Sequence, residues 1–220
     1  KTAYEIKECD WSSDVCSSDL AFGDVNLNRS VELFPSAEDK TAVDADLADI
    51  MDKFIVVHMR NWHWPAKNIT MDVWLDVYTQ LFSERADFQV VCVGGPTDFY
   101  IEDHPLFVDQ RGKLNSQQLK YLCDHARCFV GIDSGPFHCA AASDTHIIGL
   151  FTHLRPECIM PQRHLDDNWN STAIQTLEDC RGCNDNQIRP VSQLNCVKQD
   201  FRCAGNFDTD AIAQAILEQL

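Results

Sequence analysis

The residues with the clearest chemical potential follow an apolar run near the middle of the chain. Residues 128–132 have the length and content of a buried strand, and residues 133–135 are Asp, Ser and Gly. Pro136 then opens a small-residue segment that we predict to be a helix, since proline is favoured in a first helical turn. Amides at a helix start that follows a strand attract anions. The sequence therefore predicts a diphosphate site at residues 133–138.

A second group of candidate residues lies in the loop at residues 58–67, after another apolar run. This loop carries Arg60 and Lys67 together with two histidines. A local basic cluster suits an anionic ligand, and loops at the carboxyl ends of parallel strands meet at one edge of a sheet. Taken alone, the loop is equally consistent with a solvated surface segment.

Four cysteines form a compact set near the C-terminus: Cys180, Cys183, Cys196 and Cys203. The Cys180-x-x-Cys183 spacing is typical of a tetrahedral zinc site. Two disulfides and four plain structural thiols fit the same spacing, so the three alternatives stay open. We expect no cofactor to be required for the chemistry, with structural zinc as one option for these thiols.

The elements that must position these residues alternate along the chain. Buried strands are predicted at residues 54–58, 89–93, 128–132 and 146–151, with a weaker one at 106–109. Helices are predicted at residues 39–53, 71–85, 116–126 and 208–220. Nearly all-apolar strands that alternate with helices indicate an α/β fold with a doubly wound, Rossmann-like parallel sheet.

Composition excludes two broad classes of function. The chain of 220 residues carries a formal charge of -16, which argues against a nucleic-acid partner held by broad phosphate attraction. No apolar run approaches the roughly 18 residues that a membrane span needs.

The first 20 residues differ in kind from the rest. Back-translated, they give the strings of a sequencing adapter, so we predict an artefact without ordered structure; a Ser/Asp-rich leader is the alternative. Residues 21–52 are then expected to form a linker and a helix. Residues 53–220 are expected to form one Rossmann-like domain with a cysteine-containing C-terminal segment.

Three stretches, taken together, resemble the glycosyltransferase family 9 proteins, the heptosyltransferases of lipopolysaccharide core assembly. They are residues 56–74 (VVHMRNWHWPAKNITMDVW), residues 90–98 (VVCVGGPTD) and residues 111–151, which contain the DSGPxH turn. The resemblance covers roughly residues 35–220. It implies the C-terminal, donor-binding half of a GT-B glycosyltransferase, which has two Rossmann-like domains.

The resemblance also implies roles for single residues. Lys67 matches a lysine that contacts the donor phosphates, and residues 133–135 match the turn that binds the diphosphate and sugar. His138 matches a histidine one helical turn later, and Asp98 lies near an acidic residue that holds the ribose hydroxyls. The substrate-binding residues expected from the loop and the resemblance are Arg60, Lys67, Gly95, Asp98, Asp133, Ser134, Gly135 and His138.

The function implied is transfer of a sugar, most simply a heptose, from an ADP-heptose-like donor to a lipopolysaccharide-type acceptor in the cytoplasm, at the inner face of the inner membrane. The catalytic base is unknown from this sequence and is expected in a preceding N-terminal domain, which would also supply any peripheral membrane contact. We therefore expect this chain to be inactive alone. The chain departs from the usual family pattern at residues 143–146 and 151–156, so the resemblance does not identify the donor sugar. The alternatives are another GT-B nucleotide-sugar enzyme, such as an epimerase, and a non-catalytic nucleotide-binding module.

Overall fold

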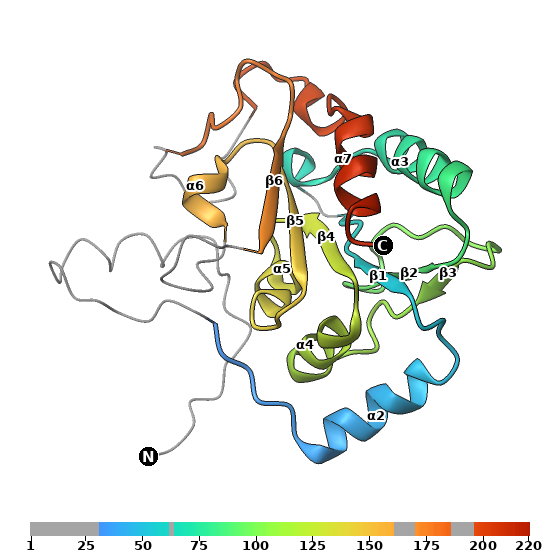
Figure 1. Cartoon of the computed structure of the whole chain (residues 1–220). Helices are drawn as coiled ribbons and strands as arrows, with labels where there is room; N and C mark the ends of the chain where they lie inside the picture. The colour runs from blue at the N-terminus through green and yellow to red at the C-terminus, as the bar shows by residue number, and fades with distance from the viewer. Residues whose placement is uncertain (1–30, 62–63, 161–169, 186–195) are drawn as a thin grey trace, which may run out of the picture.

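A parallel sheet forms the centre of the fold (Figure 1). The computed structural model describes residues 31–61, 64–160, 170–185 and 196–220. Within them, six parallel strands run in the order β3-β2-β1-β4-β5-β6. The strands are β1 (Phe54–Val57), β2 (Gln89–Cys92), β3 (Phe107–Asp109), β4 (Cys128–Ile132), β5 (His146–Phe151) and β6 (Ser171–Gln175). The doubly wound Rossmann-like fold predicted from the sequence is confirmed.

The strand order reverses between β1 and β4, which lie side by side although β2 and β3 come between them in the chain. Ligands of doubly wound sheets bind at the carboxyl edge where the order reverses. The loops that leave β1 and β4 at this edge begin at His58 and Asp133, so the fold brings the two candidate segments to one place.

Helices cover both faces of the sheet. They are α2 (Ala37–Leu47), α3 (Met71–Glu84), α4 (Ser116–His125), α5 (Gly135–Ala140), α6 (Pro156–Ile159) and α7 (Thr209–Leu217), with the short 3-10 turns η1 (Pro65–Lys67) and η3 (Arg202–Ala204). Side-chain caps set several of the starts. Ser36 and Asn115 each form a capping box at the start of α2 and α4.

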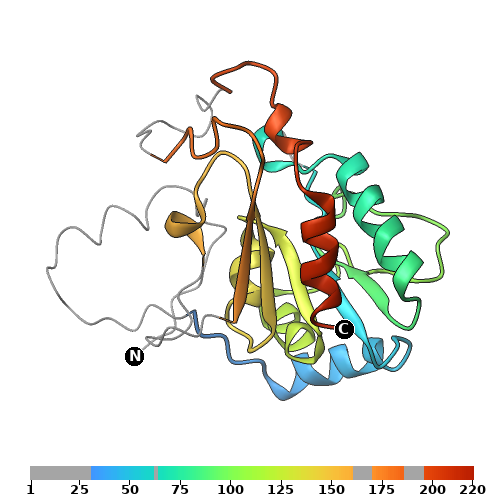
Figure 2. The ribbon, with the colours of Figure 1, turned by 45° about the horizontal axis from the view of Figure 1, so that its top comes forward.

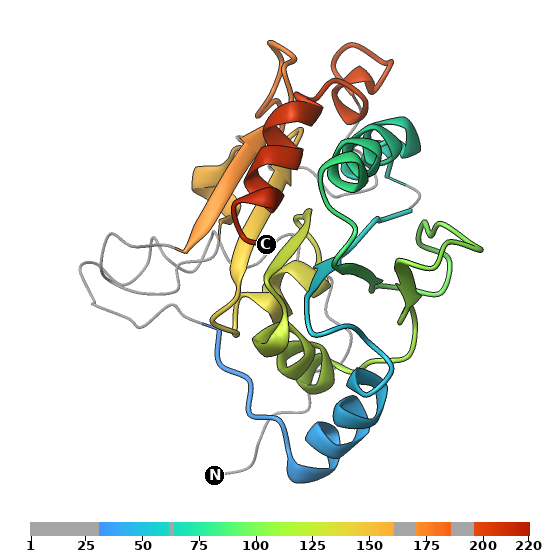
Figure 3. The same ribbon diagram turned by 45° about the vertical axis from the view of Figure 1, so that its right-hand side comes forward.

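One face of the sheet is covered by α3 and α7, which lie side by side in Figures 2 and 3. Trp74, Val77 and Leu81 of α3 are buried there together with Ile212 and Ile216 of α7. The spacing of these apolar residues is that of one helix face, which explains why both segments are helical and where they pack.

The opposite face is covered by α2, α4 and α5, which Figure 3 shows away from α7. Phe137 of α5 is fully buried and packs edge-on against Phe129 of β4 and Phe151 of β5. The apolar residue that follows the predicted turn therefore anchors α5 to the sheet. This contact holds the turn at residues 133–135 against the carboxyl end of β4.

Two elements were not predicted from the sequence. Strand β6 reads STAIQ and its residues are half-buried or exposed, because it lies at the edge of the sheet and lacks the apolar run of the central strands. The short helix α6 begins at Pro156. The helix predicted at residues 39–53 is shorter than expected: it begins at Ala37, after its Ser36 cap, and ends at Leu47.

None of the helices in the described part of the chain combines the length and the apolar character that a membrane crossing requires. The adapter-like residues 1–20 lie outside the described residues, as does His63 of the basic loop.

Candidate functional site

A partly buried ion-pair cluster joins the loop after β1 to the turn after β4. The Lys67 Nζ atom lies 2.6 Å from Asp133 Oδ2, and Nε2 of His138 lies 3.1 Å from Asp133 Oδ1. Lys67 is placed by the η1 turn that Pro65 opens, and His138 by α5. Lys67 from the basic loop and His138 from the DSGPxH turn therefore meet at the carboxylate of Asp133.

The electrostatics of this cluster keep Asp133 ionised. Burial alone would raise the pKa of Asp133, but its hydrogen bond with His138 and the adjacent charge of Lys67 outweigh that effect and hold the pKa below its ordinary range. The Lys67 side chain is only 9% exposed and its Nζ atom also lies 5.0 Å from the Trp64 ring centroid. Lys67 and Asp133 are thus a largely desolvated pair of charges beside the turn.

A second buried chain of hydrogen bonds links three strand ends. Nε2 of His58 lies 3.0 Å from Asp98 Oδ2, and Nδ1 of His58 lies 2.9 Å from Ser134 Oγ. His58 directly follows β1, Asp98 belongs to the loop after β2, and Ser134 follows β4. All three are buried, with exposed fractions of 3%, 8% and 5%.

Asp98 also fixes two backbone segments. Its Oδ1 accepts the Asn61 N–H at 2.8 Å, and its Oδ2 accepts the Gly95 N–H at 2.7 Å. Burial would raise the pKa of Asp98, but the hydrogen bonds from His58 and from these two amides lower it overall. Both carboxylate oxygens of Asp98 are therefore already engaged within the protein.

Gly94 is required for this arrangement. Its φ angle is +123°, and a Cβ atom there would lie 2.3 Å from Asp98 Oδ2 and 2.5 Å from His58 Cδ2. Any side chain would therefore be strained and would collide with the Asp98–His58 pair.

A pocket of about 340 Å³ lies against the Asp98 and His58 members of this chain. Its walls come from the carboxyl-edge loops of β1 and β2 and from the starts of α4 and α5. The lining residues include His58, Arg60, Gly95, Asp98, Asn115, Ser116, Gly135 and Cys139. This volume lies within the range of small-molecule and cofactor sites.

The structure groups the predicted site residues into two neighbouring sets that share the turn after β4. Lys67, Asp133 and His138 form the ion-pair cluster, and Asp98 and Ser134 belong to the hydrogen-bond chain. Arg60, Gly95 and Gly135 line the pocket. Ser134 also caps α5 by accepting the Phe137 N–H.

His58 is the site residue that the sequence analysis missed as an individual. Its position directly after a buried strand was one signal, and the Gly94-Gly95 pair in a neighbouring loop was another. Neither signal pairs His58 with Asp98 and Ser134, which lie 40 and 76 residues away in the sequence.

The four C-terminal cysteines surround a separate small cavity. Cys180, Cys183, Cys196 and Cys203 all line a space of about 10 Å³, and each carries a thiol rather than a disulfide. Their sulfurs are not tightly gathered: among the described residues, no three of them lie within 4.8 Å of one another. A space of this size admits about one water-sized occupant.

Three buried polar atoms of residues that line this cavity lack partners among the described residues: Trp64 Nε1, His153 Nε2 and Asn184 Oδ1. Thr152 Oγ1 donates to the Ala66 carbonyl, so the Nδ1 atom of His153, 3.0 Å away, must donate to Thr152. His153 Nε2 therefore carries an unprotonated lone pair, on a residue that lines the cavity. Burial and the nearby charge of Lys67 lower the pKa of His153 to about 4, which keeps the ring neutral.

The cavity thiols differ in acidity. Burial, with the neighbouring thiols, raises the pKa of Cys203 to about 11. Burial opposes ionisation of Cys196 as well, but backbone N–H groups of residues 198–201 outweigh it and lower that pKa. The backbone of its turn thus makes the Cys196 thiol more acidic than that of Cys203.

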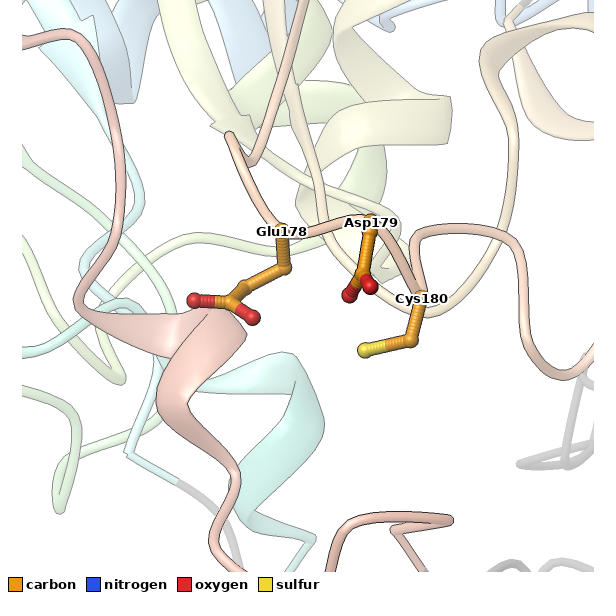
Figure 4. Close-up of side chains that lie close together, drawn as sticks. All are labelled: Glu178, Asp179 and Cys180. Atoms are coloured by element: carbon orange, nitrogen blue, oxygen red, sulfur yellow. The ribbon is translucent and has the colours of Figure 1, made fainter.

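A third group of possible ligands, Glu178, Asp179 and Cys180, points to one side of the loop after β6 (Figure 4). Here the carboxylates already have partners: Lys198 pairs with both acids, and Asn206 donates to Glu178 at 2.7 Å. The Asp179 side chain is 83% exposed. The two acids of this group therefore belong to an ion-pair network with Lys198, in which the Glu178 side chain is only 11% exposed.

Comparison with known proteins gives the family. The family model described as glycosyltransferase family 9 (heptosyltransferase) matches residues 18–187. Over 40 residues the chain is 50% identical to lipopolysaccharide heptosyltransferase 3 of Escherichia coli, a stretch that is 18% of this chain and 12% of that protein.

Solved structures show the same fold. A family 9 glycosyltransferase from Veillonella parvula aligns with a TM-score of 0.65 at 12% identity, over 86% of this chain and 53% of that one. The iron-containing heptosyltransferase TibC, from enterotoxigenic Escherichia coli, was solved with ADP-D-beta-D-heptose. It aligns with a TM-score of 0.55 at 18% identity, over 76% of this chain and 46% of that one. The chain thus spans about half the length of these structures, and the matched family model covers most of it: the chain belongs to glycosyltransferase family 9.

Proposed function

We propose that this chain holds the nucleotide-sugar donor of a glycosyltransferase that moves a heptose from an ADP-heptose-like donor to a lipopolysaccharide-type acceptor. Family membership supports glycosyl transfer, and the heptosyltransferase relatives support the sugar. TibC, a protein of the same fold, was solved with ADP-D-beta-D-heptose, which favours an ADP-linked donor. The cytoplasmic location and the lipopolysaccharide acceptor follow from the same likeness and remain predictions.

The observation that carries the proposal is the position of the 340 Å³ pocket at the carboxyl edge of β1, β2 and β4, where the strand order reverses. Gly95 and Asp98 line its β2 side, and Gly135 lines its β4 side. We place the nucleoside against the β2 loop and the diphosphate against the turn after β4. Lys67 and His138 stand at that turn, around Asp133.

The proposed chemistry is stabilisation of a leaving diphosphate. Negative charge grows on this group as the sugar leaves, and preorganised donors in a desolvated site stabilise it. Lys67 supplies a buried positive charge, and His138, whose side chain is 35% exposed, is open to a ligand. Asp133 holds both side chains in place. The described residues thus have a donor-binding role, and the general base and the acceptor site are assigned to the rest of the protein.

Calorimetric titration of the chain with ADP, GDP, UDP and CDP tests the donor proposal. We expect ADP to bind best, and Lys67→Ala to weaken ADP binding by about 1–3 kcal/mol, the range for a charged hydrogen bond. Lys53→Ala is the control, because Lys53 forms its ion pair with Asp87. Absence of binding by any nucleoside diphosphate at millimolar concentration would refute the proposal.

The full-length protein, given a labelled donor, then separates the remaining alternatives. Labelled sugar on a lipid or glycan acceptor supports transfer. Labelled sugar altered but still attached to the nucleotide would indicate an epimerase. Nucleotide binding without any product would indicate a binding module.

We further propose that Cys180, Cys183, Cys196 and Cys203 hold one structural metal ion. The supporting observations are the ion-sized cavity that all four line and the lone pair of His153 Nε2 that faces it. Sulfur and imidazole donors suit zinc and iron. TibC, which shares the fold, is an iron-containing protein, and this makes iron a candidate beside zinc. A metal here would tie residues 180–183 to residues 196–203.

Elemental analysis of protein purified without chelators tests this. We expect about one equivalent of zinc or iron, retained in Cys139→Ala and lost in Cys203→Ala. Cys139 is a suitable control because it lines the 340 Å³ pocket rather than the cysteine cavity. Metal-free protein in which all four of these cysteines react as free thiols would support plain structural thiols. A mass lower by the hydrogens of two disulfides would support the disulfide alternative.

A further inference from the structure

The Asp98–His58–Ser134 chain joins the two halves of the pocket through buried atoms. Asp98 and Ser134 sit on loops after β2 and β4, and each contacts a different nitrogen of the same imidazole. We infer that His58 is a positioning residue that acts through Ser134 and couples the nucleoside half of the pocket to the diphosphate half. This inference rests on the proposed donor site.

The hydrogen-bond partners assign the protons of the chain. The Asp98 carboxylate can only accept, so His58 Nε2 must carry a hydrogen and donate to it. In the neutral ring Nδ1 is then an acceptor, and the Ser134 hydroxyl donates to it. Ser134 Oγ in turn accepts the Phe137 N–H at 3.4 Å.

In this assignment the Ser134 hydroxyl proton is used in the hydrogen bond to His58 Nδ1. The Ser134 hydroxyl therefore has no proton left to donate to an anion bound at the turn. Donors for a diphosphate come instead from the backbone of the turn and from Lys67 and His138. His58 thus determines whether the Ser134 hydroxyl can donate a hydrogen bond to a ligand, and it acts on the turn through Ser134.

The same chain transmits changes between the loops. Asp98 holds the Gly95 and Asn61 amides as well as His58, so a change at Asp98 alters both the β2 wall and the ring that fixes Ser134. Residues that share no contact normally contribute additively to binding. Asp98 and Ser134 share His58, so their contributions should depend on each other.

A ligand-free measurement tests the proton assignment. In nitrogen-15 NMR spectra of the full chain at pH 8, His58 should show a protonated Nε2 and an unprotonated Nδ1. Ser134→Ala should move the Nδ1 resonance, and Asn115→Ala should leave it unchanged. A ring protonated at Nδ1, or an Nδ1 resonance indifferent to Ser134, would overturn the inference whatever the ligand.

A double-mutant cycle on ADP affinity tests the coupling. We expect Asp98→Asn and Ser134→Ala each to weaken ADP binding. The loss of ADP affinity in the double variant should be smaller than the product of the two single losses by more than about threefold. The reason is that both changes break the same hydrogen-bond chain. The control cycle pairs Ser134→Ala with Asn115→Ala. Asn115 lines the same pocket, but its hydrogen bonds go to Gln118 and Asp39.

The outcomes separate the two proposals. ADP binding with a coupling above about threefold supports the inference. Binding with a smaller coupling, or with equal coupling in the control cycle, overturns it and leaves the donor site in place. No ADP binding by the wild-type chain refutes the donor site itself. Melting temperatures of all variants identify any loss that comes from unfolding.

Discussion

The buried Lys67–Asp133 pair allows a quantitative test of the site's electrostatics. Lys67→Met keeps most of the aliphatic length that packs near Trp64 but removes the charge. Asp133 would then keep only His138 as its partner in the cluster. Removing one member of a buried ion pair typically costs about 3–5 kcal/mol, because a charge is left uncompensated in a desolvated place. With His138 still present, we expect about 2–4 kcal/mol.

The chain offers a matched control for this change. Lys53 and Asp87 form a pair of almost the same length, 2.7 Å against 2.6 Å, but their side chains are 33% and 53% exposed, compared with 9% and 17% for Lys67 and Asp133. Exposed pairs contribute little to stability, so Lys53→Met should leave the free energy of unfolding nearly unchanged. The assay is urea unfolding followed by circular dichroism at pH 7.

The double variant Lys67→Met, Asp133→Asn extends the test. It removes the uncompensated charge, so it should be more stable than Lys67→Met alone. If Lys67→Met and Lys53→Met lost equal stability, burial would not be what makes the Lys67–Asp133 pair strong. The description of Lys67 and Asp133 as a largely desolvated pair of charges would then be wrong.

Three further predictions concern single residues. Gly94→Ala should weaken ADP binding at least tenfold, measured by calorimetry, because its Cβ would lie 2.3 Å from Asp98 Oδ2; Gly205→Ala, where the nearest atom would be 3.3 Å away, is the comparison. The folded-state pKa of Asp133 is below its ordinary value near 4, so its charge stabilises the fold above that pH, and the contribution disappears as the pH falls through the lower folded value. With Asp133→Asn, the urea midpoint of unfolding should therefore fall less steeply as the pH is lowered below the ordinary pKa of an aspartate. Asp208→Ala removes the cap that accepts the Ala211 N–H and should cost about 1 kcal/mol in the same assay, with ADP affinity unchanged.

The central sheet could be predicted from the sequence because its strands are buried on both faces. β1, β2, β4 and β5 are nearly continuous apolar runs, and each was predicted within a residue of its bounds. β6 was not predicted, because an edge strand needs no apolar run and its residues Ser171–Gln175 are mostly polar or small. Helix ends were less certain, since a cap such as Ser36 acts through a few local hydrogen bonds that no apolar pattern marks.

The site was predictable in its parts but not in its pairings. The DSG turn and Lys67 stood out by type and spacing, and the fold brings them together at one strand edge. The partnership of His58 with Asp98 and Ser134 depends on tertiary distances between three loops, which no local pattern encodes. For the four cysteines, spacing alone could not decide between metal, disulfides and thiols, and the cavity they share adds an observation that the sequence lacked.

The most direct test of the donor site is a map of the backbone amides that respond to ADP. In nitrogen-15 spectra of the chain titrated with ADP, we expect the largest shifts at Gly94, Gly95 and Asn115 on one side of the pocket and at Ser134 and Gly135 on the other. Saturable shifts confined to other surfaces, such as residues 180–184 at the cysteine cavity, would contradict the placement of the donor at the carboxyl edge of β1, β2 and β4.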